Sequence, residues 1–441
     1  MEHFKQRKKL LFVLLLLVAF LFRLAFGLCS EFWYEDELQV YLLGLKFFST
    51  GAWPYYGPDV TFQIQIPGAL QSLAVAVPLY VWPVVEAPFL LLNALSFAAL
   101  CLFAWYCTKR LPELPRWFVW TWLLTAPWTL NFSTHVVNPS YVLPGSILFF
   151  VGALEIFPFT SKHLIQTRYA WLMLGAALCW VMQFHMSWVL LVPYVLSAFY
   201  FHYRDAGSAR ALKSLAWFGG GAALTGAFLL PTYLKFGISG GTGGTAATIA
   251  FNALNLRRNL NLPEGILARF LSFASFEIPR FLGSGGGKRL LFLKEEMWLI
   301  PFVLFLVVVG TLQPIAMIWL WFSKRTAHPD WKAIKYLTLL TVVLLYASFA
   351  FAIKPPSSHT FYVVFPVAML YSLYCWRPFM QRRGWRKFAA ACLACGVVFH
   401  TGLAIHNFSR HSLYVDRSIP ETAIRMKDYR IMGERRPGSF Y

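Results

Sequence analysis

Apolar runs of roughly 17 to 25 residues recur along almost the whole chain, and they limit what it can fold into. A helix of about 20 apolar residues is long enough to cross the hydrocarbon core of a bilayer. Only 13% of the residues are charged, where a soluble domain carries about a quarter, and the mean hydropathy is +0.55. This pattern predicts an all-α, multi-pass membrane protein.

One apolar stretch, residues 62–85, is ambiguous. It carries Gln63 and Gln65 together with prolines, a composition unusual for a simple span. We therefore expect broken helices that lie along the outer membrane interface. The remaining runs predict a bundle of about 11 spans, near residues 10–28, 88–107, 116–133, 140–158, 169–182, 186–202, 214–234, 298–322, 334–353, 360–376 and 388–406.

The distribution of basic residues predicts the orientation. If residues 62–85 do not span, 21 Lys and Arg side chains lie in the cytoplasmic loops and the N-terminal tail together, and the short outer connections hold only Lys46 and Lys354. If they do span, nearly all the basic clusters move outside, against the positive-inside rule. We therefore expect a cytoplasmic N-terminus and an outer C-terminus. The net charge of +20 belongs to these loops, and without a folded basic domain it does not indicate nucleic-acid binding.

The expected organisation is one transmembrane domain and a tail. The domain covers residues 1–406 and includes a first outer loop, 29–87, and a long outer loop, 235–297. Residues 407–441 form a polar outer tail. The N-terminal run lacks small-x-small residues before Cys29, so it is interpreted as a retained helix and not as a cleaved signal peptide. The scattered cysteines suit buried packing, including the CxxC pair Cys392 and Cys395.

The first outer loop carries the richest chemistry. Glu31, Glu35, Asp36 and Glu37 place four of the 19 carboxylates within seven residues. Clustered carboxylates raise one another's pKa, which suits a proton acceptor or a divalent-cation site. The alternative is a solvated loop, but the neighbouring aromatic side chains indicate an interfacial setting.

The other short outer connections also carry polar residues beside helix ends, where such groups suggest function. Lys354 could have a functional role or could extend from a helix end to the interface. His185 could be a ligand or a structural residue, and His135 is a further candidate. Asn138 could contact substrate or, with Pro139, start a helix.

Taken in order, these motifs resemble a known family. The sequence is similar to GT-C glycosyltransferases, in the branch of protein O-mannosyltransferases and bacterial lipid A aminoarabinose transferases (glycosyltransferase family 39-like). One departure is the connection 134–139, which offers His135 and Asn138 where the oligosaccharyltransferase branch has carboxylates, and this argues against a multi-carboxylate metal site. The residues that carry the resemblance are Asp36-Glu37, Tyr41, Gly51, Pro54-Tyr55, Asn138-Pro139, Gln183-x-His185 and Pro-x-x-x-His-x-Phe-Tyr at 355–362.

The resemblance implies a reaction at the outer face of a bacterial inner membrane. A sugar would pass from a polyprenyl-phosphate donor to a hydroxyl on a lipid, glycan or protein acceptor, with Asp36 as general base. Glu37 is the second catalytic candidate: it could bind the acceptor or a divalent cation, or repel Asp36 and so tune its pKa. Lys354 and His359 are expected to contact the phosphate, with Arg257 and Arg258 as rivals. His185, Asn138 and Tyr41 would complete the substrate contacts. Metal dependence stays open: a divalent cation, if one is used, would take Glu37 and His185.

Three other classes of function remain as alternatives. A transporter or flippase of lipid-linked sugars that couples to protons or ions would be expected to carry ionisable residues near span centres, and no span centre carries an obvious acid. A glycan polymerase or ligase of another fold would rely on Arg and His in a large late loop. A scaffold would not need polar groups concentrated on one face.

Overall fold

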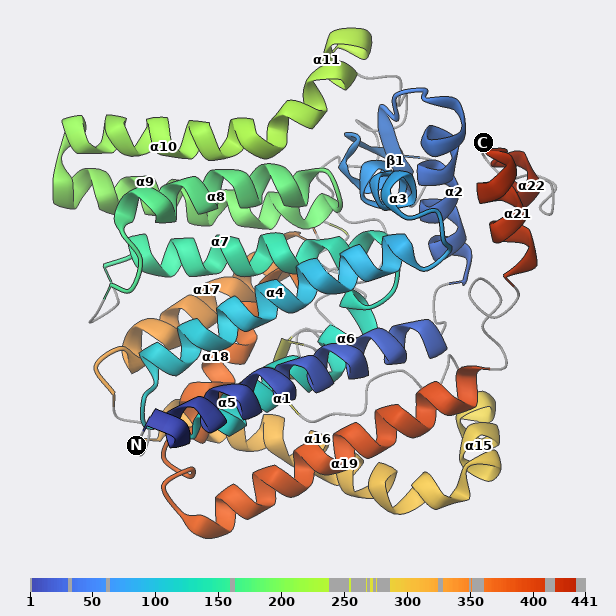
Figure 1. The fold of residues 1–441 in the computed structure, drawn as a ribbon. Coiled ribbons are helices and arrows are strands. Elements are labelled where there is room, and N and C mark those ends of the chain that lie inside the picture. The colour runs from blue at the N-terminus through green and yellow to red at the C-terminus, as the bar shows by residue number, and fades with distance from the viewer. Residues whose placement is uncertain are drawn as a thin grey trace.

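The computed structural model shows a helical bundle whose long helices run side by side (Figure 1). It describes residues 2–30, 34–60, 64–158, 163–237, 254, 267, 270–272, 275, 286–323, 328–348, 350, 361–408 and 417–433. The principal elements are α1 (Glu2–Cys29), α2 (Tyr34–Thr50), β1 (Tyr56–Val60), β2 (Ile64–Pro67), α3 (Leu70–Val81), α4 (Ala87–Arg110), α5 (Arg116–Thr125), α6 (Pro127–Ser133), η1 (Asn138–Tyr141), α7 (Val142–Ile156), α8 (Thr167–Met182), η2 (Met186–Leu191), α9 (Val192–Ala206), α10 (Ser208–Gly226), η3 (Ala227–Leu229), α11 (Leu230–Phe236), α15 (Gly286–Glu295), η5 (Met297–Leu299), α16 (Ile300–Phe322), α17 (Trp331–Ser348), η8 (Tyr362–Val364), α18 (Phe365–Trp376), α19 (Arg383–Phe408), α21 (Ser418–Met426) and α22 (Arg430–Gly433).

Eight helical segments of the described chain are long and apolar enough to cross a membrane. They confirm the multi-pass, all-α prediction, to which the structure adds one small β-hairpin. Three other predicted spans, 116–133, 169–182 and 360–376, correspond to shorter or interrupted helices. The span 116–133 is divided at Ala126, between α5 and α6. The total of about 11 spans stays a prediction.

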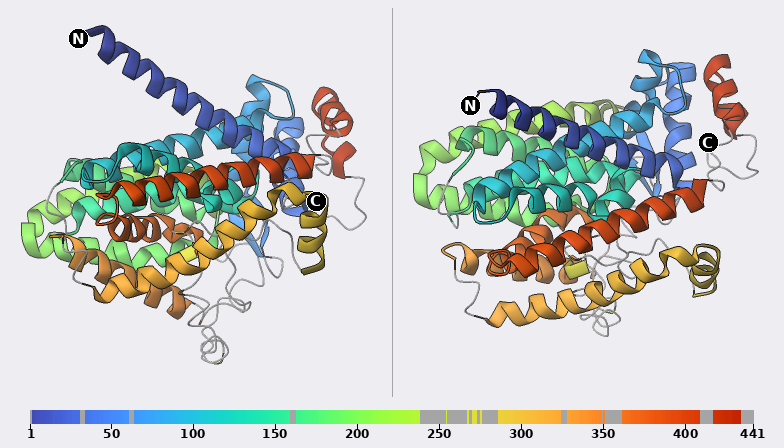
Figure 2. Two further views of the ribbon diagram at one scale, coloured as in Figure 1. Left: turned by 90° about the horizontal axis from the view of Figure 1, so that it is seen from below. Right: turned by 60° about the horizontal axis from the view of Figure 1, so that its bottom comes forward.

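The core of the bundle is built around α7, nearly all of whose side chains are buried. The neighbouring helices α8 and α10 approach each other closely at Gly175 and Gly221, where an added Cβ would lie 2.0 Å from a backbone oxygen of the facing helix. By contrast, the first half of α1 exposes a run of leucine and valine side chains, and this end of the helix projects from the bundle (Figure 2). An apolar surface of this kind suits contact with lipid.

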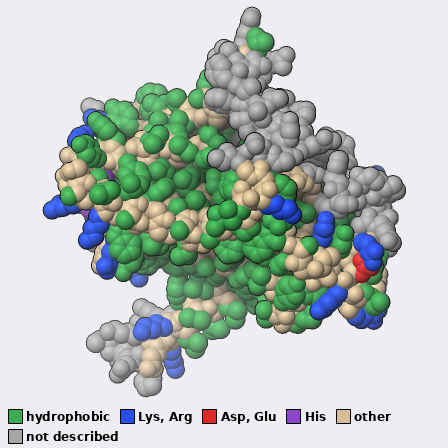
Figure 3. Space-filling view, turned by 90° about the horizontal axis from the view of Figure 1, so that it is seen from above, with side chains coloured by type: hydrophobic (Ala, Val, Ile, Leu, Met, Phe, Trp, Pro, Cys, Tyr) green, Lys and Arg blue, Asp and Glu red, His purple; other side chains and the backbone are tan. Residues whose placement is uncertain are grey.

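Hydrophobic side chains cover the middle of the face in Figure 3, and Lys and Arg side chains lie toward both of its ends, with one group of them at its left end. That end holds the loop between α9 and α10 (Figure 1). Arg204, in the last turn of α9, and Arg210, in the first turn of α10, lie on either side of this connection and are both exposed.

The elements of the first loop gather at the end of the bundle away from the N-terminus, together with α21 and α22 (Figure 1). Helix α2 runs across the direction of α4 and α7 instead of along it. Residues 62–85 were expected to form only broken helices, and this was wrong for part of them. Residues 64–67 are β2, which pairs antiparallel with β1, and a single helix, α3, follows. Pro67 ends the strand because proline has no N–H to continue the ladder.

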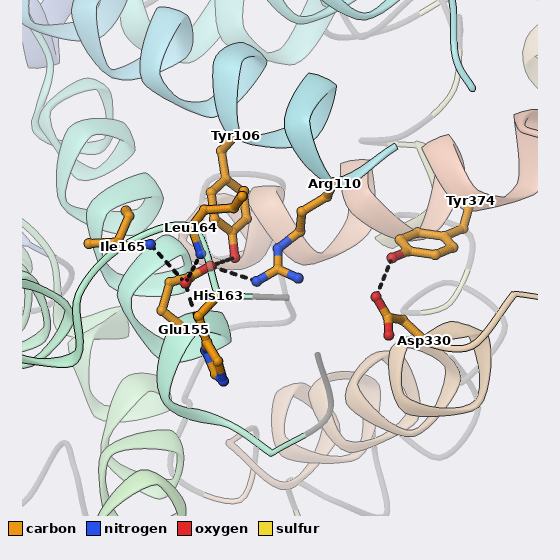
Figure 4. Close-up of polar contacts among 8 residues, drawn as sticks. All are labelled: Tyr106, Arg110, Glu155, His163, Leu164, Ile165, Asp330 and Tyr374. Carbon is orange, nitrogen blue, oxygen red and sulfur yellow. Dashed lines mark hydrogen bonds and ion pairs between the residues drawn. The ribbon is translucent and has the colours of Figure 1, made fainter. Parts of the chain in front are cut away.

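At the opposite end, a buried carboxylate ties two helices and a loop together (Figure 4). Glu155, at the end of α7, accepts hydrogen bonds from the Arg110 guanidinium at 2.6 Å and the Tyr106 hydroxyl at 2.8 Å. It also accepts from the backbone N–H groups of Leu164 and Ile165, at 2.6 and 3.0 Å. A buried charge with this many donors is well satisfied, so the cluster fastens this end of the bundle.

Candidate active site

Asp36 and Glu37 of the acidic cluster lie in the first turn of α2, and these two adjacent carboxylates have different surroundings. Asp36 is exposed, whereas Glu37 is 1% exposed. Because consecutive residues point about 100° apart on a helix, one can face the core while the other faces outward. Glu37 Oε1 accepts a hydrogen bond from the backbone N–H of Val136 at 3.2 Å. Glu31 and the side chain of Glu35 lie outside the described residues.

The segment after α6 is the partner of Glu37, and His135 secures it. This imidazole is fully buried, and its Nε2 donates to the carbonyl of Ser30 at the end of α1. Its Nδ1 lies 3.1 Å from the Thr134 hydroxyl. The ring of Phe26 packs edge-on against it at 6.0 Å. His135 is therefore placed as a structural residue between α1 and the second outer connection.

Asn138 opens the 3-10 turn η1, as one alternative for Asn138-Pro139 predicted. Its side chain is half-buried, and no side-chain cap closes this turn. At the other end of η1, the ring of Tyr141 stacks on Phe184 with centroids 5.0 Å apart. The Tyr141 carbonyl accepts from the indole N–H of Trp180 at 2.7 Å. These contacts bring the second and third outer connections together.

His185 caps the turn η2. Its Nδ1 accepts from the backbone N–H of Ser187 at 3.1 Å and lies 2.8 Å from the Ser187 hydroxyl. The ring is half-buried. Nearby, the side chain of Gln183 lies against the end of the β-hairpin, where a Cβ added at Gly68 would be 2.6 Å from it. Gly68 also has a φ of +116°, which favours glycine. The first outer loop therefore contacts the third connection directly.

Tyr41, expected to contact substrate, is fully buried in α2. Its hydroxyl donates to the carbonyl of Val85 at 3.0 Å. Burial raises the pKa of the Tyr41 hydroxyl well above its usual range, with a smaller contribution from the nearby Glu86 carboxylate. These contacts give Tyr41 a packing role between α2 and the segment before α4.

The C-terminal tail docks on the first loop. The Arg417 guanidinium lies 3.3 Å from the Glu86 carboxylate. The Lys427 ammonium lies 5.7 Å from the ring centre of Phe48 in α2. Ile424 is buried, so α21 contributes an apolar face as well as charges. The tail, predicted only as polar, thus includes a helix packed against the elements that hold Asp36.

Four predicted substrate contacts, Lys354, His359, Arg257 and Arg258, lie outside the described residues. The chain that follows 354–359 is described, and it reaches the same region of the bundle. The Tyr362 ring lies 5.4 Å from that of Phe132 in α6. The Ser146 hydroxyl donates to the carbonyl of Val363 at 2.6 Å.

The sequence did not decide whether the protein binds a metal ion. Within the described part of the chain, no group of three or more His, Cys, Asp or Glu side chains is arranged to hold one. Glu37 instead contacts a backbone N–H, and His185 Nδ1 contacts Ser187.

Among the residues that the structure describes, several buried polar atoms have no hydrogen-bond partner. Both amide atoms of Gln71 in α3 are of this kind, as are Gln183 Oε1 and the Tyr141 hydroxyl. A Cβ added at Gly57 would lie 3.5 Å from Gln71 Oε1, which places this amide beside β1. Buried polar groups are nearly always hydrogen-bonded, so these atoms are donors and acceptors suited to water or a hydroxyl-bearing ligand.

Arg23 is an important residue that the sequence reasoning passed over. It lies in α1, inside an apolar run, and is fully buried. Ionisable residues inside a membrane helix are rare and suggest function, so its position alone was a usable signal. The charge count covered only loops and tails, which is why it was missed.

No family model matches the sequence, and no curated protein does. Among solved structures, the fold is similar to the crystal structure of ArnT from Cupriavidus metallidurans bound to undecaprenyl phosphate. The TM-score is 0.49 with 13% sequence identity, over 96% of this chain and 76% of that chain. A likeness at this level does not extend to substrates or catalytic residues.

Proposed function

We propose that this chain is a membrane glycosyltransferase of the GT-C type. It moves a sugar from a polyprenyl-phosphate donor to a hydroxyl acceptor at the end of the bundle that carries α2. That end faces the extracytoplasmic side of a bacterial inner membrane, with the N-terminus in the cytoplasm. The observation that carries the proposal is the pair Asp36 and Glu37, one exposed and one buried, where three connections meet.

In this mechanism Asp36 is the general base. The acceptor O–H transfers its proton to the Asp36 carboxylate while the acceptor oxygen forms a bond to the anomeric carbon. The bond from that carbon to the phosphate oxygen breaks, and polyprenyl phosphate leaves with the electron pair. Glu37 acts as an anchor: its bond to the Val136 N–H supports the rotation of α2 that turns Asp36 outward.

The leaving phosphate needs positive charge that is already in place. Lys354 is proposed for this role, with His359 as an additional donor and Arg257 and Arg258 as rivals. The sugar needs groups that recognise hydroxyls. Gln71 and Gln183, which lie against the hairpin, and Tyr141 in η1 have unsatisfied polar atoms. Asn138 and His185 lie on the neighbouring connections and are proposed to line the acceptor side.

The proposal is tested by Asp36→Asn. Purified protein is incubated with a panel of polyprenyl-phosphate hexoses and pentoses, with cell-envelope extract as acceptor, and release of polyprenyl phosphate is measured. We expect normal folding, because the side chain is exposed, and a loss of roughly 10²- to 10⁴-fold in rate, typical of removing a general base.

Glu421→Gln is the matched control. It removes one carboxylate from α21, at the same end of the bundle, so it reproduces the change in net charge. We expect this variant to retain full activity. An Asp36→Asn protein with more than about a tenth of the wild-type rate would rule out Asp36 as the base. A wild-type protein that moves lipid-linked sugars across vesicles without releasing polyprenyl phosphate would favour a transporter.

A further inference from the structure

Helix α1 presents a stripe of three residues to the broken span α5–α6 and the segment after it. Arg23, Gly27 and Ser30 are spaced i, i+4 and i+7, so they share one helix face. Arg23 contacts both halves of the broken span. Gly27 packs against the Thr134 backbone, and Ser30 contacts His135. Each residue thus contacts a point further along the chain between Leu124 and His135.

Arg23 makes four hydrogen bonds, all to uncharged oxygens. Its Nη1 donates to the Leu124 carbonyl at 2.9 Å and to the Thr129 hydroxyl at 3.0 Å. Its Nη2 donates to the Thr129 carbonyl at 2.8 Å and to the Ser133 hydroxyl at 2.6 Å. The planar guanidinium therefore joins the end of α5 to the length of α6.

The break between α5 and α6 explains why a charge is tolerated here. Pro127 has no N–H, so carbonyls in the last turn of α5 lose their helical partners. An unsatisfied carbonyl inside a membrane costs several kcal/mol. Leu124 lies in that last turn, and the negative end of the α5 dipole also stabilises the guanidinium. The buried guanidinium therefore satisfies a carbonyl that the helix break leaves without its helical partner, and this carbonyl in turn stabilises the buried charge.

The stripe leads directly to the proposed active site. Ser133, which Arg23 holds, is followed by Thr134, whose carbonyl lies against Gly27. The next residue, His135, bonds Ser30. The residue after that, Val136, donates its N–H to Glu37. The path from Arg23 to the acidic turn of α2 is thus continuous.

We propose that Arg23 is a positioning residue: by holding α6 and the segment 134–136, it fixes Glu37 and so aims Asp36. This rests on the proposed function where it concerns transfer. The coupling between Arg23 and Glu37 does not depend on that function. A residue with a merely structural role would lower stability without favouring Glu37 over other buried acids.

A double-mutant cycle on thermal unfolding tests the coupling without any activity assay. Arg23→Gln is combined with Glu37→Gln and, as control, with Glu155→Gln from the buried cluster at the other end of the bundle. We expect Arg23 and Glu37 to be coupled: the loss in Tm of the double variant should be at least about 3 °C smaller than the summed losses of the two single variants. We expect Arg23 and Glu155 to be additive. Additivity in both pairs overturns the proposal.

Steady-state kinetics test the effect on transfer. At a temperature well below every Tm, we expect Arg23→Gln to lower kcat by at least about tenfold with less than a threefold change in the donor KM. Arg23→Lys should recover part of kcat because the ammonium keeps the charge. The recovery should be incomplete because the ammonium cannot bridge both halves of the span. Glu155→Gln, despite its own loss of Tm, should stay within twofold of the wild-type kcat.

The outcomes separate the two proposals. Equal losses of kcat in Arg23→Gln and Glu155→Gln overturn the positioning role. If the cycle shows coupling between Arg23 and Glu37 but the wild-type protein shows no transfer, the proposed function is overturned and the positioning is supported. If Arg23→Gln does not fold, Ser133→Ala replaces it, since this change removes one acceptor and leaves the other three bonds.

Discussion

Gly27→Ala should disturb the site by a distance that follows from the structure. A Cβ at this position would lie 2.4 Å from the Thr134 carbonyl oxygen and 2.4 Å from the Phe89 ring. Ordinary contact begins at 3.4 Å, so a displacement of about 1 Å is needed. The Phe89 ring belongs to a side chain, whereas Thr134 O belongs to the backbone and cannot be moved by a change of rotamer. The displacement therefore falls on α1 or on the segment 134–136.

Two consequences of that displacement can be measured. Overpacking of this kind costs about 1–3 kcal/mol, which should appear as a lower Tm of the purified protein. A shift of about 1 Å in a positioning segment can reduce turnover by about 10²-fold. We therefore expect a modest loss of stability and a large loss of kcat, measured by thermal unfolding and by release of polyprenyl phosphate.

Gly396→Ala is the matched control for Gly27→Ala. Gly396 lies in α19, and no atom lies within 4 Å of its added Cβ. Alanine favours helix over glycine by up to about 1 kcal/mol, so this variant should be as stable as wild type or more so, with full activity. Wild-type turnover in Gly27→Ala would refute the close contact between α1 and residue 134 as a determinant of the site.

Two further variants test packing elsewhere. Gly221→Val places a Cβ 2.0 Å from the Leu172 carbonyl, which should force α8 and α10 apart and lower the Tm strongly. The control Gly220→Ala, in open space on the same helix, should not lower the Tm. Equal Tm values for the two variants would contradict the close helix approach. Tyr41→Phe removes the hydroxyl bond to Val85, so we expect a loss of about 0.5–1.5 kcal/mol in unfolding free energy and unchanged kinetics. A tenfold rise in KM there would instead assign Tyr41 to substrate binding.

The helical spans could be predicted because bilayer length and apolar composition constrain them directly. The same reasoning failed for residues 64–67, which form a strand. The sequence pattern that indicates this strand is Ile-Gln-Ile-Pro beside a second short segment, and it is weak in a chain so rich in apolar residues. The break at Pro127 was visible in the sequence, but not the residue that compensates for it. Arg23 lies more than 100 positions away in the chain, and only the packed bundle joins the two.

The docking of the tail was unpredictable for a related reason. Short polar helices gain their order from tertiary contacts and not from their own propensity. The tail is held by contacts of Arg417 with Glu86 and of Lys427 with Phe48. Nothing in the sequence predicts that these residues pair with each other. The sequence therefore indicated where the tail begins but not what it covers.

The acidic cluster shows most clearly where sequence reasoning ends. Asp36 and Glu37 are neighbours with similar chemistry, and nothing in their order along the chain says which one faces outward. Their roles depend on the rotation of α2, and the bond from Val136 N–H to Glu37 is one contact that fixes this rotation. A turn of α2 by one residue, about 100°, would bring Asp36 to the buried position that Glu37 now occupies. Because segment 134–136 is held by Arg23, Gly27 and Ser30, the choice between two adjacent acids is made by contacts in a different helix.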